Sequence, residues 1–265
     1  MRILVTNDDG VTAAGLQALV GGLRRIAEVI IVAPDREQSA VGTALTLRHP
    51  IRAQKVIPVV EGIETYAVSG TPGDSVIMGL SRLVGKVDLV VSGINHGPNL
   101  GDDILISGTV GGALQGYLHG ISSIAVSVAG LNGSYYTDLA SANFTDTAKF
   151  ITLIAAALMK GQLTQKVFLN VNVPDLVSQE IAGIQVTRPS TTGYADIVEE
   201  GHDGRNEYYW LKHRKASNHA PRNTDAWAIS RRQISITPLH TYLFGKRQPV
   251  LNGQFTGLLD ELKSF

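Results

Sequence analysis

The 265-residue sequence contains no cysteine. This absence excludes disulfide bonds, thiolate metal sites and cysteine nucleophiles, so a metal would need oxygen or imidazole ligands. The chain also lacks net charge, because 23 acidic residues balance 23 basic ones. No overall field therefore attracts nucleic acid or an anionic membrane. We expect no stable complex with nucleic acid.

Long apolar segments are missing as well. No uninterrupted apolar run reaches the about 20 residues that a membrane-spanning helix needs. The start of the chain, MRILVTNDD, lacks the apolar core and cleavage site of a signal peptide. We therefore expect a cytoplasmic protein without a membrane segment. Its length suits one large α/β domain or two smaller ones, with a substantial core.

Short runs rich in Val and Ile recur along the first two thirds of the chain. Several are continuous rather than alternating, which is typical of parallel strands covered on both faces. Segments with helical spacing lie between them, including 16–23 and 138–160. This alternation predicts a doubly wound α/β sheet. The expected strands are residues 2–6, 29–33, 88–93, 123–128 and 166–173.

The pattern changes after about residue 174. The runs QVTRPS, NEYYWLK and QISITPL predict shorter strands joined by polar loops that carry Gly and Pro. Residues 202–215 combine aromatic side chains with local positive charge. We interpret this stretch as an exposed hairpin or as a surface for another subunit or a nucleotide. A nucleic-acid groove is a third reading, disfavoured by the small excess charge.

Two adjacent carboxylates, Asp8 and Asp9, follow the first expected strand. An Asp-Gly turn is one explanation, since this pair is common where a chain bends. However, ligands bind beyond the carboxyl ends of the strands in doubly wound sheets, and both acids occupy such an end. Successive strand residues face opposite sides, so the two side chains can converge only where the chain bends, which Gly10 permits.

A glycine-rich stretch follows the strand expected at 88–93. Asn95 and Asn99 stand among Gly93, Gly97 and Gly101, where we expect a long loop to leave the sheet. Such a loop can bring backbone N–H groups and amide oxygens close to a ligand.

The same stretch continues into Ser107, Gly108 and Thr109, which precede a small-residue helix, VGGALQG. The free N–H groups and the positive dipole end of that helix favour a phosphate. Ser and Thr are also ordinary helix caps, so either feature alone would indicate only local structure.

Other catalytic patterns find little support. Ser39 lies in VAPDREQSAVG without a GxSxG motif, which argues against a serine hydrolase. The seven histidines form no HExxH pair, and only His96, inside the glycine-rich stretch, lies near the candidate site.

Three related folds also fit poorly. A nucleotide-cofactor dehydrogenase could use Asp35 for a ribose, but its first turn should be rich in glycine rather than carry Asp8 and Asp9. A phosphatase with an aspartyl nucleophile generally has a second acid two residues after the first, where this chain has Gly10. A phospho-accepting receiver would need an acceptor Asp after the third strand and a lysine after the fifth, and neither is found.

Five ordered motifs together resemble the SurE family of survival-protein nucleotidases. The resemblance covers nearly the whole chain, with SITPL at 235–239 matching a late strand, and is weakest between about 175 and 233. It implies a single domain over 1–265 with a Rossmann-like fold and C-terminal hairpin and helical extensions. The five motifs are TNDDG (6–10), APDREQS (33–39), SGINHGPNLGDD (92–103), SGTVGGALQG (107–116) and LNVNVP (169–174).

The resemblance also implies an activity: metal-dependent hydrolysis of nucleoside 5′- and 3′-monophosphates by a homodimer or homotetramer. The variable extension around 190–235 would make the subunit contacts. The family's metal ligands map onto Asp8, Asp9, Ser39 and Asn95. All four are oxygen donors, which suits one Mg²⁺ or Mn²⁺ ion per subunit better than zinc.

These residues define the expected chemistry. A divalent cation would offset the repulsion between Asp8 and Asp9, polarise a phosphoryl oxygen and lower the pKa of a bound water. One of these two acids would orient or deprotonate that water. Asn95, Asn99 and residues 107–109 would contact the substrate. The alternative is a nucleotide- or phosphate-binding sensor with vestigial catalysis, which the intact ligand set disfavours.

Overall fold

The structure, a computed structural model, describes residues 1–131, 142–161, 165–191, 197–212, 220–240 and 257–264. Its centre is a nine-stranded sheet with the order β3-β4-β2-β1-β5-β6-β7-β11-β8. The run from β4 to β7 is parallel, whereas β3 and β11 join it antiparallel to β4 and β7. The predicted doubly wound, mainly parallel α/β sheet is confirmed.

The five expected strands are all present, each within a few residues of its predicted bounds. The strands are β1 (Arg2–Thr6), β2 (Glu28–Pro34), β3 (Ala53–Lys55), β4 (Glu64–Val68), β5 (Leu89–His96), β6 (Ser122–Ala129), β7 (Phe168–Pro174), β8 (Gly183–Val186), β9 (Ile197–His202), β10 (Glu207–Lys212) and β11 (Gln233–Pro238).

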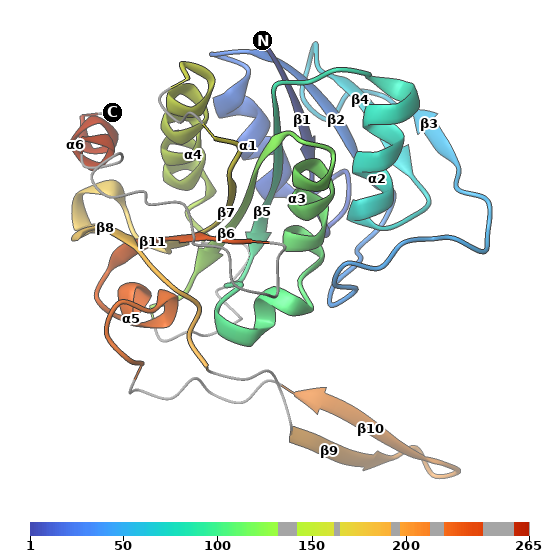
Figure 1. The fold of residues 1–265 in the computed structure, drawn as a ribbon. Coiled ribbons are helices and arrows are strands. Elements are labelled where there is room, and N and C mark those ends of the chain that lie inside the picture. The colour runs from blue at the N-terminus through green and yellow to red at the C-terminus, as the bar shows by residue number, and fades with distance from the viewer. Residues whose placement is uncertain (132–141, 162–164, 192–196, 213–219, 241–256, 265) are drawn as a thin grey trace.

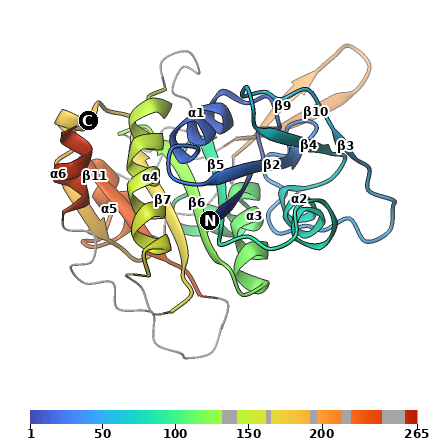
Figure 2. The ribbon, with the colours of Figure 1, turned by 90° about the horizontal axis from the view of Figure 1, so that it is seen from above.

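Helices cover both faces of the sheet (Figure 1). The α1 and α4 helices pack together on one face, and α2 and α3 pack together on the other; Figure 2 shows the same two layers from above. The α-helices are α1 (Ala14–Leu23), α2 (Pro72–Met78), α3 (Gly108–Leu118), α4 (Phe144–Met159), α5 (Asp225–Ser230) and α6 (Leu258–Lys263). None of the helices in the described ranges is long and apolar enough to cross a membrane.

The continuous apolar strands are buried on both sides, as their composition predicts. Ile3 and Val5 belong to the larger core cluster under α1 and α4, while Leu4 faces the smaller cluster under α2. All three side chains have no solvent-accessible surface. Strand side chains alternate between two covered faces, which explains why this strand is a continuous apolar run up to the polar residues at its end.

The β5 strand is longer than expected. We predicted that the chain leaves the sheet at Gly93, but β5 continues to His96, and Asn95 pairs in register with Ser127 of β6. A register shift between Ser92 and Asn95 accommodates the change. The loop begins only at Gly97, so Asn95 sits on a strand rather than on a loop.

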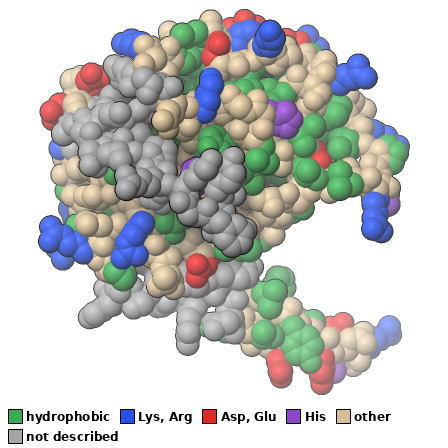
Figure 3. Space-filling view, viewed as in Figure 1, with side chains coloured by type: hydrophobic (Ala, Val, Ile, Leu, Met, Phe, Trp, Pro, Cys, Tyr) green, Lys and Arg blue, Asp and Glu red, His purple; other side chains and the backbone are tan. Residues whose placement is uncertain are grey.

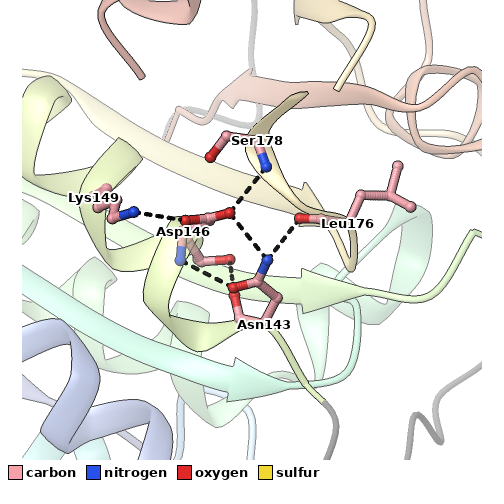
Figure 4. Close-up of polar contacts among 6 residues, drawn as sticks. Asn143, Asp146, Lys149, Leu176 and Ser178 are labelled. Atoms are coloured by element: carbon pink, nitrogen blue, oxygen red, sulfur yellow. Dashed lines mark hydrogen bonds and ion pairs between the residues drawn. The ribbon is translucent and has the colours of Figure 1, made fainter. Parts of the chain in front are cut away.

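The α4 helix is shorter than the predicted 138–160. It begins at Phe144, because Asn143 caps it by accepting a hydrogen bond from the Asp146 N–H at 3.1 Å. Residues 138–141 lie outside the described residues. Figure 4 shows how Asp146 then accepts the Ser178 N–H at 2.9 Å and pairs with Lys149 at 3.0 Å, which joins the helix to the segment after β7.

The late segments also match their predicted types. β9 and β10 form a separate antiparallel hairpin that extends away from the sheet (Figure 1). Residues 213–215 of the aromatic and basic stretch lie outside the described residues. The hairpin itself is confirmed, whereas a partner for it is not tested by a single chain.

Candidate functional site

The turn after β1 gathers the first polar groups of the site. The Asn7 side chain donates to the Gly10 carbonyl at 2.9 Å, and the Val11 N–H donates to Pro34 O at 2.8 Å. Gly10 has a φ of 97°, and a β-carbon there would lie 3.2 Å from the Arg36 carbonyl carbon. Glycine therefore allows the bend that turns Asp8 and Asp9 out of the strand pattern.

Asp8 lies against the start of α3. Its side chain is buried, and it accepts hydrogen bonds from the Thr109 hydroxyl and the Thr109 backbone N–H. A β-carbon at Gly108 would lie 2.8 Å from the Asp8 Cβ. Only glycine lets the helix approach this closely, so the first acid and the predicted phosphate seat are in direct contact.

Burial raises the pKa of both carboxyl groups. The pKa of Asp8 rises to about 6, with desolvation partly offset by its bonds to Thr109. The pKa of Asp9 rises to about 7, first through desolvation and then through the charge of Asp8, although the backbone N–H of His96 lowers it. Glu37 adds a further negative charge that raises both values.

No lysine or arginine in the described ranges forms an ion pair with Asp8 or Asp9. Two neighbouring buried carboxylates without a cationic partner are costly, and a divalent cation removes that cost. No group of three or more His, Cys, Asp or Glu residues suited to a metal occurs among the described residues. Any cation here would therefore combine two carboxylates with neutral oxygen donors.

The two neutral donors implied by the family resemblance come from different elements. Ser39 is exposed in the loop after β2, and its hydroxyl donates to Glu37 Oε1 at 2.6 Å. Asn95, near the end of β5, donates a hydrogen bond from its side-chain nitrogen to Gly97 O at 2.9 Å. Its side-chain oxygen takes no part in that bond. Ser39 follows β2 and Asn95 lies on β5, and these two strands flank β1 in the sheet.

The remaining predicted residues have local partners. Ser107 caps α3 by accepting from the Val110 N–H at 3.1 Å, and Thr109 is fully buried beside Asp8. Asn99 is also buried, and its amide donates to Ser127 Oγ at 2.7 Å. Asn99 thus bonds within the protein interior, while Gly108 and Thr109 lie against Asp8.

Sequence reasoning did not identify Glu37, whose charge acts on both aspartates, or the His96 backbone contact to Asp9. The DREQS motif shows that Glu37 lies two residues before Ser39, but it does not show that the loop folds back onto Asp8. That return is fixed by the Gln38 N–H, which donates to Asp8 O at 2.7 Å.

The chain is similar to known proteins over most of its length. The family model for survival protein SurE matches residues 3–196. A 5′-nucleotidase SurE of Dehalococcoides mccartyi (strain CBDB1) is 49% identical over 269 residues, covering 100% of this chain and 98% of the relative. A 5′-nucleotidase SurE of Geobacter sulfurreducens is 45% identical over 242 residues, covering 91% and 88%.

A solved structure shows the same fold. The crystal structure of the SurE protein from Aquifex aeolicus superposes with a TM-score of 0.77 at 34% identity, covering 99% of this chain and 100% of that one. The sequence motifs, the family model and the structural likeness extend over most of the chain. The chain belongs to the SurE family.

Proposed function

We propose that this protein is a 5′-nucleotidase that releases phosphate from nucleoside 5′-monophosphates, and from 3′-monophosphates as a second substrate class, with one divalent cation per subunit. The observation that carries the proposal is the pair of Asp8, which is buried against the start of α3, and Asp9, which is partly buried; neither forms an ion pair with a lysine or arginine of the described residues. The nucleotidase activity is supported by relatives that carry the name 5′-nucleotidase.

The residues present fit a hard cation. Asp8 and Asp9 supply carboxylate oxygens, and Ser39 and Asn95 supply a hydroxyl and an amide oxygen, the donor types that Mg²⁺ and Mn²⁺ prefer. When bound, the ion would polarise a phosphoryl oxygen and acidify a water. The raised pKa values of the two acids support this proposal, because burial disfavours their charged forms and a bound cation would stabilise them.

The phosphate would lie against residues 107–109. The α3 helix runs for 11 residues, and its amino end points its dipole at this position. Thr109 joins the two halves of the site, since its hydroxyl and N–H already contact Asp8. The phosphate site and the cation site would therefore both include or adjoin Thr109.

We assign the two acids different parts. Asp8 is tied to Thr109 and keeps the helix end in place. Asp9 is less buried and receives one backbone hydrogen bond, from His96. Asp9 is therefore the better placed to orient the attacking water and to accept its proton.

The hairpin formed by β9 and β10 is our candidate for contact with a second copy of this chain. Its side chains include Tyr208, Tyr209, Trp210 and Leu211, with 45%, 56%, 63% and 69% of their surface exposed. Figure 3 shows hydrophobic side chains on this projection. An apolar, aromatic surface of this kind is typical of an interface.

Phosphate release from a nucleoside 5′-monophosphate, with and without a chelator, tests the proposed function. We expect release that stops in chelator and returns when Mn²⁺ or Mg²⁺ is added in excess. Nucleotide binding without release under any metal condition would instead indicate a sensor with vestigial catalysis.

A further inference from the structure

The chain between β5 and α3 connects the two halves of the proposed site. Asn95 lies near the end of β5, just before this segment, and Ser107–Thr109 lie where the segment enters α3. The intervening segment, 97–107, contains Gly97 and Gly101 with φ values of 119° and 57° and a short 3₁₀ helix, η2 (Gly101–Leu105). Glycine backbone is intrinsically permissive, so the position of this segment must be fixed by contacts from outside it.

The first such contact is made by β7. The Asn172 side chain accepts the Asn99 N–H at 2.9 Å and donates to the Asn99 carbonyl at 3.0 Å. Asn170 donates to the same carbonyl at 2.8 Å. Both asparagines are fully buried. Side chains of β7 therefore bond both the N–H and the carbonyl of Asn99, as the backbone of a neighbouring strand would.

The second contact is made by Asp225, at the start of α5. Its side chain is fully buried, and Oδ2 accepts the Gly101 N–H at 2.8 Å. Oδ1 accepts the N–H groups of Ser190 and Ala226 at 2.8 and 2.7 Å. Hydrogen bonds from backbone N–H groups to a carboxylate are among the stronger ones, and three of them compensate a buried charge.

We propose that Asn172 and Asp225 are positioning residues of the active site, which hold segment 97–107 so that Asn95 keeps its place beside the cation and 107–109 beside the phosphate. The inference rests on the proposed function. Asp225 lies beyond the region that the family model matches, 3–196. The C-terminal part of the chain would thus support catalysis within its own subunit, separately from the hairpin.

Two nearly isosteric substitutions test the two contacts separately. Asp225→Asn keeps Oδ1 for Ser190 and Ala226 but turns an NH₂ group toward the Gly101 N–H. Asn172→Asp keeps the acceptor for the Asn99 N–H but places an oxygen against the Asn99 carbonyl. If one variant fails to fold, the other still tests the proposal.

Asp146→Asn is the matched control. Asp146 also accepts a backbone N–H, that of Ser178, but it joins α4 to the segment after β7 (Figure 4). The chemical change is the same as in Asp225→Asn, and neither 97–107 nor a proposed metal ligand is among its partners.

Two properties are measured for each variant: Mn²⁺ binding by calorimetry, and amide hydrogen exchange of the peptide covering 97–107. We expect Asp225→Asn and Asn172→Asp to weaken Mn²⁺ binding by about tenfold or more, as changes behind metal ligands do, and to speed exchange in 97–107. Asp146→Asn should lower the melting temperature and leave both readouts at their wild-type values.

The proposal is overturned if the folded variants bind Mn²⁺ as tightly as wild type or leave exchange in 97–107 unchanged. A wild-type protein that binds no Mn²⁺ would refute the proposed metal site instead. In that case exchange alone decides: faster exchange in 97–107 would retain the two contacts as anchors of this segment, and unchanged exchange would refute them.

Discussion

At the residue scale, Asp8 and Asp9 are the two charged ligands of the proposed cation site. Changing either to Asn keeps the size of the side chain but removes one charged oxygen donor. We expect Asp8→Asn and Asp9→Asn each to reduce turnover by at least about a hundredfold, since changes behind metal ligands already cost 10–100-fold. Steady-state kinetics at saturating Mn²⁺ measure this, with circular dichroism to verify folding. Near-wild-type rates in both variants would refute the site.

The same pair predicts a pH dependence of stability in metal-free protein. Burial raises the pKa of Asp9 from 3.8 to about 7, so the folded state binds the proton more tightly than the unfolded state. The free energy of unfolding should therefore fall as pH rises between about 4 and 7. Asp9→Asn removes this loss, so its melting temperature in chelator should equal or exceed that of wild type at pH 8. If the variant melts at a lower temperature than wild type at pH 8, but not at pH 4, the predicted fall in stability with rising pH is contradicted.

Thr109 tests the proposed link between cation and phosphate. Thr109→Val removes the hydroxyl that contacts Asp8 but keeps the β-branched shape. We expect inhibition by inorganic phosphate to weaken more than Mn²⁺ binding does, because the cation would retain all four of its ligands. Inhibition constants and calorimetry make the comparison. If a crystal soaked with phosphate showed the ion bound elsewhere and none at 107–109, the proposed phosphate site would be wrong.

At the element scale, runs rich in Val and Ile identified the five expected strands because these strands are largely buried on both faces. It failed where a boundary depends on a partner. β5 continues past Gly93 because β6 offers a register for Asn95 and His96. The α4 helix begins late because Asn143 caps it and bonds Asp175. The pairing with β6 and the contact with Asp175 join residues at least 32 positions apart, so local composition does not reveal them.

The β9–β10 hairpin carries the prediction that belongs to this scale. We expect the protein to form a dimer or larger assembly through contacts that include the segment after residue 190, because the hairpin exposes Tyr, Trp and Leu side chains. Light scattering across micromolar concentrations measures the mass, and Trp210→Ser should shift the population toward monomer. Monomer mass for wild type throughout that range would contradict the prediction.

At the scale of the whole molecule, the sequence predicted the mainly parallel sheet and the end of β1 with the two acids that follow it. It could not predict that Glu37 folds back toward Asp8, or that Asp225 reaches Gly101 across 124 positions. Such contacts depend on tertiary packing, and a lone Asp before a short helix resembles an ordinary first-turn acid. Local patterns thus locate the site, while the groups that hold it in place become visible only in the folded chain.

Binding energy from sugar and base, together with a cation at Asp8 and Asp9, would direct hydrolysis to nucleotides. The cation and the N–H groups of α3 can engage any phosphomonoester, so selectivity must come from the non-reacting part of the substrate. Residues 93–101 offer the amides of Asn95 and Asn99 and contain no Phe, Tyr or Trp. We therefore expect differences between bases on the order of tenfold, comparable to one neutral hydrogen bond.

The most direct measurement is kcat/KM for the nucleoside 5′-monophosphates and for a simple sugar phosphate, each with and without chelator. We predict higher values for the nucleotides than for the sugar phosphate, loss of all activity in chelator, and recovery with Mn²⁺ or Mg²⁺. Equal values for the sugar phosphate would contradict the nucleotidase assignment but leave a phosphatase. Full activity in chelator would contradict the proposed cation at Asp8 and Asp9, and with it the metal-dependent hydrolysis assigned to this site.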